Sequence, residues 1–192
     1  MLFDIEKDSI SSLPVLKYEG EIVFIEKSKD VRSCTDEILE EEIIGIDTET
    51  KPAFKKGVYH PVALLQIATS DKVFLFRLNM LTDFKDLKPI FEAEELLKIG
   101  IGLRDDIREL KQLIKFEPEG FIDLNEEAPK IGFKKIGMRN LSAMILDSRI
   151  SKRQQVSDWE KHTLSKAQID YAATDAWVSR LLFMKLLEEG KI

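Results

Sequence analysis

The chain has 192 residues, of which 44% are hydrophobic and 33% are charged, and it carries one cysteine, Cys34. This length and balance indicate one soluble domain with a full core, and a single cysteine excludes a disulfide framework or a cysteine metal site, so we expect a cytoplasmic protein. The net charge of −6 argues against a protein that coats nucleic acid, but not against a nuclease that grips one strand end.

The hydrophobic pattern divides the chain into alternating strands and helices. Residues 1–19 have mixed polarity, and their charges interrupt any signal-peptide core, so we interpret them as an N-terminal extension before a single domain at 20–192. No apolar run approaches the roughly 18 residues of a membrane span, so no membrane partner is expected. In chain order the periods predict an edge strand at 21–27, a helix at 28–42, a strand at 43–48, a hairpin of strands at 62–69 and 73–78, a helix at 84–96, a strand at 98–101, a helix at 103–114, a strand or extended link at 120–124, helices at 125–131 and 139–146, a polar connector at 151–162 and a helix at 165–189. This order predicts an α/β fold with a mixed sheet.

Two carboxylates, Asp47 and Glu49, stand at the end of the predicted strand at 43–48. Side chains alternate along a strand, so both point to the same face. Two carboxylates on one buried face repel each other unless a cation lies between them, and hard divalent cations prefer such oxygen ligands. Pairs of this kind also occur by chance, so the pair alone does not establish a metal site.

A third acidic position follows the predicted strand at 98–101. At 100° per residue, Asp106 lies about 40° from the inward-facing Leu110, whereas Asp105 lies about 140° away. Asp106 is therefore expected to point inward and Asp105 to solvent. Simple charge complementarity at a helix start also explains two aspartates here. The glycines at 100 and 102 resemble a dinucleotide-binding fingerprint only superficially.

The last predicted helix carries Tyr171 and Asp175, which are four residues apart and share a face. Apolar residues surround almost the whole helix, so we expect it to be largely interior. A buried ionised aspartate is costly unless it is paired or binds a cation. Taken singly, a core tyrosine with a satisfied hydroxyl and a buried salt bridge explain these two residues.

Taken together, the motifs resemble the DEDD exonuclease superfamily, which is DnaQ-like, in its tyrosine-containing branch. The motifs are D-x-E after an apolar strand, an aspartate shortly after K-x-G-x-G, and Y-x-x-x-D on a late helix. The resemblance spans roughly residues 22–189. This region resembles most the exonuclease domain of Werner syndrome helicase and the catalytic domain of ribonuclease D. Ser157-Asp158-Trp159 departs slightly from the usual Ser-Asn-Trp of the family.

The resemblance implies a ribonuclease H-like three-layer fold, with a central mixed β-sheet flanked by helices. It implies a 3′-5′ exonuclease that uses two divalent ions, Mg²⁺ or Mn²⁺, and releases nucleoside 5′-monophosphates. Asp47, Glu49 and Asp175 would hold the metal on the nucleophile side. Asp47 would also reach the second metal, supported by Asp106, and Tyr171 would orient the attacking water. Two cations about 3.5–4 Å apart can activate water and neutralise the leaving oxygen.

The partner implied is a nucleic-acid 3′ end, of DNA or RNA, with a separate helicase as a further candidate partner. Basic residues near the motifs are candidates for phosphate contacts, and two family-like residues for the terminal nucleotide. These predicted nucleic-acid contacts are Leu65, Gln66, Lys55, Lys56, Arg139 and Arg153. Two alternatives stay open: a catalytically inactive nucleic-acid-binding or interaction module on the same fold, and a metal-dependent phosphatase or nucleotide hydrolase.

Overall fold

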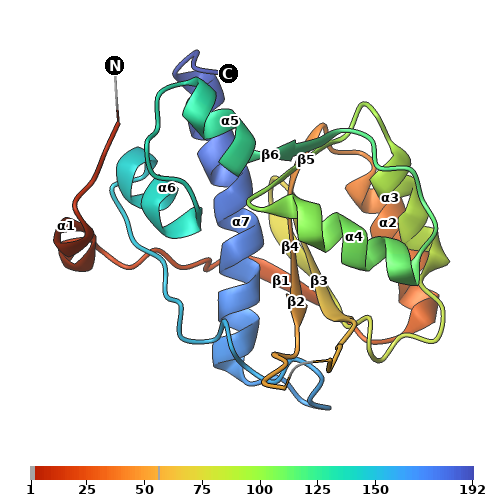
Figure 1. Cartoon of the computed structure of the whole chain (residues 1–192). Helices are drawn as coiled ribbons and strands as arrows, with labels where there is room; N and C mark the ends of the chain where they lie inside the picture. The colour runs from red at the N-terminus through yellow and green to blue at the C-terminus, as the bar shows by residue number, and fades with distance from the viewer. Residues whose placement is uncertain (1–2, 56) are drawn as a thin grey trace.

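A mixed six-stranded sheet forms the middle of the computed structural model, which describes residues 3–55 and 57–192 (Figure 1). Its strands are β1 (Glu21–Ile25), β2 (Ile43–Thr50), β3 (Val62–Ala68), β4 (Lys72–Phe76), β5 (Leu97–Gly100) and β6 (Phe121–Asp123). The strand order is β1-β4-β3-β2-β5-β6, which places β2 inside the sheet and β1 at an edge. The β2–β3 and β3–β4 pairs are antiparallel, and the other pairs are parallel. The predicted edge strand and hairpin are thus confirmed.

Helices cover both faces of the sheet and complete the predicted α/β three-layer fold. They are α1 (Lys7–Ser12), α2 (Ser28–Ile38), the 3₁₀ turn η1 (Lys85–Leu87), α3 (Lys88–Glu92), α4 (Leu103–Leu113), α5 (Leu124–Lys130), α6 (Met138–Ile145) and α7 (Lys166–Glu188). Figure 1 shows α2, α3 and α4 on one face, with α1, α6 and α7 on the other. The single helix expected at 84–96 is instead a 3₁₀ turn followed by α3, which has Pro89 in its first turn. Proline is tolerated there but would break a helix that began several residues earlier.

Both faces of β2 are covered, and each carries a different kind of residue. Ile44 and Ile46 belong to the hydrophobic core on the α2–α4 side. On the other face, small residues let α7 approach the sheet closely. A Cβ atom placed on Gly45 would lie 1.9 Å from the backbone oxygen of Ala176, so only glycine fits at this crossing.

Sequence-local motifs fix both ends of α7. Ser165 and Gln168 form the predicted capping box at the N-terminus. At the C-terminus, Gly190 adopts a positive φ of 62°. The backbone N–H of Gly190 bonds to the oxygen of Leu187 at 3.0 Å, and that of Lys191 bonds to the oxygen of Leu186 at 2.9 Å. This is a Schellman motif, which ends the helix where the glycine was expected to end it.

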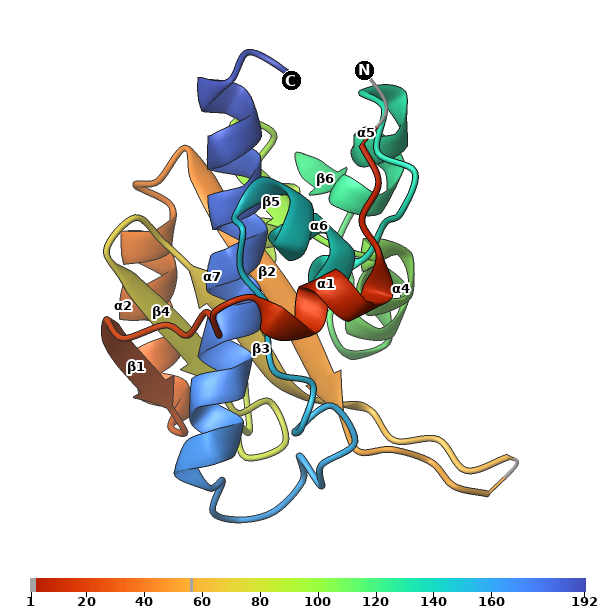
Figure 2. The same ribbon diagram turned by 90° about the vertical axis from the view of Figure 1, so that its left-hand side faces the viewer.

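The N-terminal segment packs along the α6–α7 face, as the red trace in Figure 2 shows. The Phe3 ring stacks on Phe133 with 4.6 Å between centroids. Ile10 is 2% exposed, and Tyr18 donates its backbone N–H to the Thr174 hydroxyl at 3.1 Å. The segment is therefore anchored to the domain at several points. None of the described helices combines the length and apolarity that crossing a membrane requires.

Lys98 on β5 is a buried cation on the α2–α4 side of the sheet. Its side chain is fully buried, and its ammonium group donates to the backbone oxygen of Ala93 at 2.5 Å. The Phe121 ring lies 5.2 Å from the same nitrogen. Burial lowers the pKa of Lys98 to about 8, because the charged form loses hydration.

We expect the Gly45→Ala substitution to destabilise the protein, because the added methyl group would force α7 away from β2. Overpacking of this kind typically costs about 1–3 kcal/mol. Urea unfolding should show a lower midpoint than that of Ile44→Val, which removes one methyl group on the opposite face of the same strand. An unchanged midpoint for Gly45→Ala would contradict the close packing described above.

Lys98 should make stability increase at alkaline pH. The unfolded lysine has a pKa of about 10.4, above the folded value of about 8, so the unfolded chain binds more protons between these values. The free energy of unfolding should therefore rise from pH 8 to 10.5 by up to about 3 kcal/mol from this group. Urea titrations of the protein and of Lys98→Met across this range measure the difference, and equal slopes for the two would refute the prediction.

Candidate active site

Three carboxylates meet on the α7 face of the sheet. Asp47 and Glu49 come from the end of β2, and Asp175 comes from the middle of α7. One oxygen from each can be chosen so that all three lie within 4.8 Å of one another. The strand alternation therefore aligns the first two as expected, and the contact at Gly45 brings the third beside them.

Asp106 lies next to this cluster in the first turn of α4, on the other side of β2. Its carboxylate accepts a hydrogen bond from the hydroxyl of Thr48, the residue between the two β2 carboxylates. Asp105 instead points to solvent, with a side chain that is 74% exposed and paired with Arg108 at 2.7 Å. The predicted inward and outward directions of the two aspartates are confirmed. Thr48 was not predicted, although its place between two acidic motif residues could have indicated a supporting role.

Without a cation, burial and mutual repulsion disfavour the ionised form of the four carboxylates. Burial first, and then the charges of Asp106 and Asp175, raises the pKa of Asp47 well above its usual range. Burial and its acidic neighbours raise the pKa of Glu49 to about 10. Burial also raises the pKa of Asp106 to about 6 and of Asp175 to about 7. Near neutral pH, full ionisation of this group requires a compensating positive charge.

The donor chemistry fits divalent cations. The cluster of Asp47, Glu49 and Asp175 offers only carboxylate oxygens, which suit Mg²⁺ or Mn²⁺ rather than a soft metal. Asp106 is close enough to extend the set through its contact with Thr48. These residues would hold the ions, and their raised pKa values indicate that binding would displace protons.

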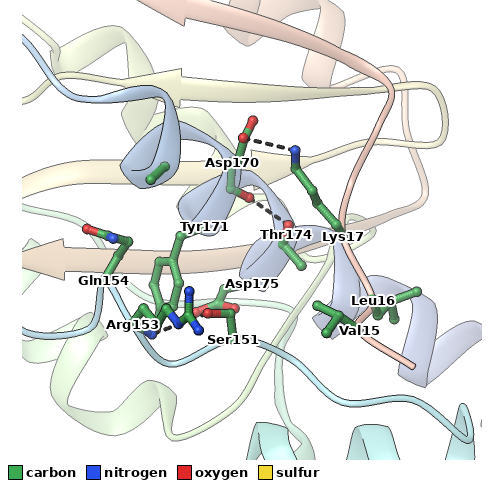
Figure 3. Close-up of a pocket in the computed structure, with 11 residues that line it drawn as sticks. Val15, Leu16, Lys17, Ser151, Arg153, Gln154, Asp170, Tyr171, Thr174 and Asp175 are labelled. Atoms are coloured by element: carbon green, nitrogen blue, oxygen red, sulfur yellow. Dashed lines mark hydrogen bonds and ion pairs between the residues drawn. The ribbon is translucent and has the colours of Figure 1, made fainter. Parts of the chain in front are cut away.

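Tyr171 lies one helical turn before Asp175 and shares its face of α7. Burial, followed by the nearby charges of Asp175 and Glu49, raises the pKa of the Tyr171 hydroxyl above its ordinary value. The hydroxyl thus stays protonated and is available to donate a hydrogen bond beside Asp175. The buried Trp159 ring lies 6.1 Å from the tyrosine ring, centroid to centroid, and supports it from the polar connector. Figure 3 shows the Tyr171 ring beside Asp175 and Arg153.

Hollows open on both sides of the carboxylates. On the Tyr171 side, a hollow of about 240 Å³ lies between the N-terminal segment, the connector and α7. On the Asp106 side, a cleft of about 560 Å³ lies between the end of β2, the loop at 51–60 and the start of α4. Asp175 lines the first hollow, and Glu49 and Asp106 line the cleft, so the carboxylate cluster borders open space on two sides.

The residues predicted to contact nucleic acid differ in their exposure. Leu65 and Gln66 are fully buried, so their side chains expose no surface, and their predicted contacts with a nucleotide stay predictions. The burial arises because β3 is covered on both faces, so that every residue of the strand is buried. Gln66 lies opposite Asp47 in the β2–β3 register, where its amide atoms have no partner among the described residues. Lys55 is exposed in the loop at 51–60, and Lys56 lies outside the described residues.

Arg139 and Arg153 lie on the Tyr171 side of the site. Arg153 is exposed and lines the same hollow as Tyr171 and Asp175. Arg139 lies farther along the same face, in the first turn of α6. The structure thus brings Arg153 to the carboxylates and leaves Arg139 at a distance from them along the surface.

Ion pairs that the sequence did not reveal join the loop at 51–60 to the connector at 151–162. The ammonium group of Lys51 lies 3.1 Å from Asp158 and 3.5 Å from Glu160. His60 Nδ1 lies 3.0 Å from Glu160. Asp158, the position at which the sequence departs from the expected Ser-Asn-Trp motif, supplies its carboxylate as the partner for Lys51. These pairs link residues about a hundred positions apart, so local patterns carry no signal for them.

Comparisons with known proteins agree with this geometry. A family model described as 3′-5′ exonuclease matches residues 22–191. The chain is 27% identical to the mouse "Bifunctional 3'-5' exonuclease/ATP-dependent helicase WRN", over 91% of this chain and 13% of that protein. It is 30% identical to ribonuclease D of Gluconacetobacter diazotrophicus, over 88% of this chain and 44% of that protein. The chain therefore spans less than half the length of these relatives.

Solved structures share the fold. The EXO domain of Aedes aegypti Nibbler superposes with a TM-score of 0.78 at 19% identity, covering 88% of this chain and 90% of that one. Escherichia coli RNase D superposes with a TM-score of 0.76 at 19% identity, covering 90% of this chain and 46% of that one. The mixed sheet with flanking helices is thus a fold found in exonucleases.

Divalent cations should stabilise the protein. At a hundred times the dissociation constant, binding adds about 2.7 kcal/mol to the free energy of unfolding. For a chain of this size this corresponds to a rise in Tm of roughly 5–10 °C, measured by calorimetry with Mg²⁺ or Mn²⁺ after removal of bound metal. The rise should be larger at pH 8 than at pH 6, because the cations compete with protons on carboxylates whose pKa values are raised.

Two variants sharpen this test. Asp47→Asn should lose most of the rise in Tm, because it removes a carboxylate of the cluster. Asp105→Asn should keep it, because Asp105 points to solvent. An equal rise for Asp47→Asn and the unsubstituted protein would show that the cations bind elsewhere.

Proposed function

The chain belongs to the 3′-5′ exonuclease family, and we propose that it hydrolyses phosphodiester bonds at nucleic-acid 3′ ends with two divalent ions, Mg²⁺ or Mn²⁺, releasing nucleoside 5′-monophosphates. The observation that carries this proposal is the meeting of Asp47, Glu49 and Asp175, whose oxygens lie within 4.8 Å of one another. The Thr48 hydroxyl joins Asp106 to this group. An all-oxygen site of this kind beside open hollows suits metal-assisted hydrolysis.

Each residue has a distinct task in this reaction. Asp47, Glu49 and Asp175 would hold the metal on the nucleophile side, and Asp47 with Asp106 would hold the second. Bound ions would supply an activated water and neutralise charge on the leaving oxygen. The protonated Tyr171 hydroxyl orients the attacking water by hydrogen bonding, since its raised pKa makes it a poor base. Trp159 behind the ring keeps the hydroxyl in place.

The substrate is proposed from the same family. One structural neighbour is a Trypanosoma brucei RNase D in complex with the RNA U12, which shares the fold at a TM-score of 0.77 and 20% identity. The mouse relative combines exonuclease and helicase in its name. We therefore extend the proposal to single-stranded 3′ ends of RNA or DNA, and to a separate helicase as a candidate partner.

An inactive nucleic-acid-binding module is the competing function. The presence of all four carboxylates and of Tyr171 favours an enzyme, because burial of four acidic groups opposes folding and a binding module does not need it. A phosphatase with similar metals would act on a terminal phosphate rather than on an internal phosphodiester bond. The experiment below separates these alternatives.

Hydrolysis should require the carboxylate cluster and metal. With a 5′-labelled oligonucleotide and Mg²⁺ or Mn²⁺, we expect progressive shortening from the 3′ end, which EDTA stops. Asp47→Ala and Asp175→Ala should abolish shortening, and Tyr171→Phe should slow it roughly 100-fold, as expected for loss of a group that positions the reacting water. Asp105→Asn, which alters an exposed neighbour of Asp106, should retain activity.

Three outcomes of this assay would refute the proposal. Shortening that persists in Asp47→Ala would remove this cluster from the mechanism. Release of phosphate from a 3′-phosphorylated mononucleotide, with no shortening of the oligonucleotide, would indicate a phosphatase. Oligonucleotide binding without hydrolysis under any metal condition would indicate the inactive module.

A further inference from the structure

Three adjoining hollows form one groove that ends at Tyr171 and Asp175. The hollow beside these two residues shares Ser151 and Arg153 with a second hollow of about 410 Å³. The second shares Arg139 and Lys152 with a third, of about 370 Å³. We call this continuous surface the basic groove.

The charge of the middle hollow differs from that of the molecule. The chain has a net charge of −6, yet the middle hollow is lined by cations and no carboxylate. Its cations are Arg139, Arg149, Lys152 and Arg153. Arg149 donates from Nε to the backbone oxygen of Leu13 at 3.0 Å, and the other three form no ion pair within residues 3–55 and 57–192.

The cleft on the Asp106 side has the opposite character. It is lined by four carboxylates, while the ammonium group of Lys51 is already paired with Asp158 of the connector and His60 contacts Glu160. The carboxylates are Glu49, Asp105, Asp106 and Glu109. Beyond the metal ligands, Asp105 and Glu109 are paired with Arg108. A polyanionic strand would therefore gain attraction along the basic groove and meet no unpaired lysine or arginine among the residues that line the cleft.

The N-terminal segment forms one wall of the basic groove. Ile5, Ser11 and the stretch at 15–17 line its three hollows in turn, opposite α6 and the connector. Figure 2 shows this segment running alongside α6 and α7. It lies outside the region that the exonuclease family model matches, which begins at residue 22. This wall is therefore a feature that the family match does not supply.

The start of α6 adds a further attraction for anions. Its N-cap is Gly137, which provides no side-chain cap, and Gly137 and Arg139 both line the third hollow. The first N–H groups of a helix have no partner within it and carry partial positive charge. The N-terminus of α6 and the side chains of Arg139 and Lys152 thus attract anions to the same part of the groove.

We propose that the basic groove binds the sugar–phosphate backbone of the single strand on the 5′ side of the scissile bond, with the N-terminal segment as one wall. This inference rests on the proposed function. It gives the strand a direction: upstream nucleotides lie along Arg153, Lys152 and Arg139, and the 3′-terminal nucleotide lies at the carboxylates. DNA and RNA share the phosphodiester backbone, so the groove is expected to accept both.

A charge-reversal pair tests the groove. In an Asp47→Asn background, which prevents hydrolysis, we compare Arg139→Glu/Lys152→Glu with Lys29→Glu/Lys115→Glu. The control changes net charge equally at two exposed lysines, one in α2 and one just after α4, on the other face of the sheet. Fluorescence anisotropy with 12-nucleotide oligothymidylate and oligouridylate, at several KCl concentrations, gives the dissociation constants.

The groove variant should weaken binding roughly tenfold or more relative to the control. The slope of log affinity against log salt should also decrease by about 1.4, because each lost single-strand phosphate contact contributes about 0.7. With Asp47 restored, the control variant should shorten the 12-nucleotide substrate at the rate of the unsubstituted protein, whereas the groove variant should shorten it more slowly. Equal affinities and equal slopes for the two variants would overturn the proposal.

The N-terminal wall has its own test. Ser11→Glu places a negative charge in the groove without disturbing a buried contact and should weaken binding several-fold, whereas Ser9→Glu on the same helix but outside the groove should not. Equal affinity for these two variants would remove the segment from the binding surface. If the unsubstituted protein hydrolyses oligonucleotides but the groove variants bind normally, only this inference fails. If it does not hydrolyse them, the proposed function fails.

Discussion

The close approach of α7 to β2 at Gly45 is the constraint on which the site depends. The backbone of Ala176 occupies the space that any other residue at position 45 would need. This contact sets Asp175 beside Asp47, although the two residues are 128 positions apart in the chain. Ala172, Ala173 and Ala176 continue the small surface of α7 against the sheet. The catalytic geometry is thus a consequence of how closely a helix and a strand can pack.

The same packing buries charged groups, and the buried groups on the two faces of the sheet have opposite charge. The α7 face gathers carboxylates that raise one another's pKa values, and therefore favours protonation or bound cations. The opposite face buries the ammonium group of Lys98, whose pKa is lowered. The sheet separates these opposite charges, so the lysine cannot neutralise the carboxylates. Positive charge must come to the site from outside the protein core.

Features set by short-range periodicity were predictable from the sequence, and those set by packing were not. The strand alternation placed Asp47 and Glu49 together, and the helix phase separated Asp106 from Asp105. The full burial of Leu65 and Gln66 comes from the covering of β3 on both faces, a condition that the sequence of the strand does not distinguish from one-sided burial.

The surroundings of the site depended on contacts distant in sequence. The N-terminal segment shows no period because single anchors such as Phe3 and Tyr18 hold it, rather than a repeating face. The basic groove and the Lys51–Asp158 pair likewise join segments that only folding brings together. Composition, with its net negative charge, gave no indication of a local cationic surface.

The capping box and the Schellman motif fix the first and last residues of α7, and therefore the length of the helix. Ser165 defines where the helix begins, and the number of residues from there to Asp175 determines where the carboxylate emerges. Inserting one residue between them would turn Asp175 by about 100° around the axis and move it about 1.5 Å along it. The length of the loop at 51–60 does not affect the positions of Asp47 and Glu49, because both residues lie in β2, before the loop begins. Tolerance to insertions and deletions should therefore differ sharply between these two parts of the chain.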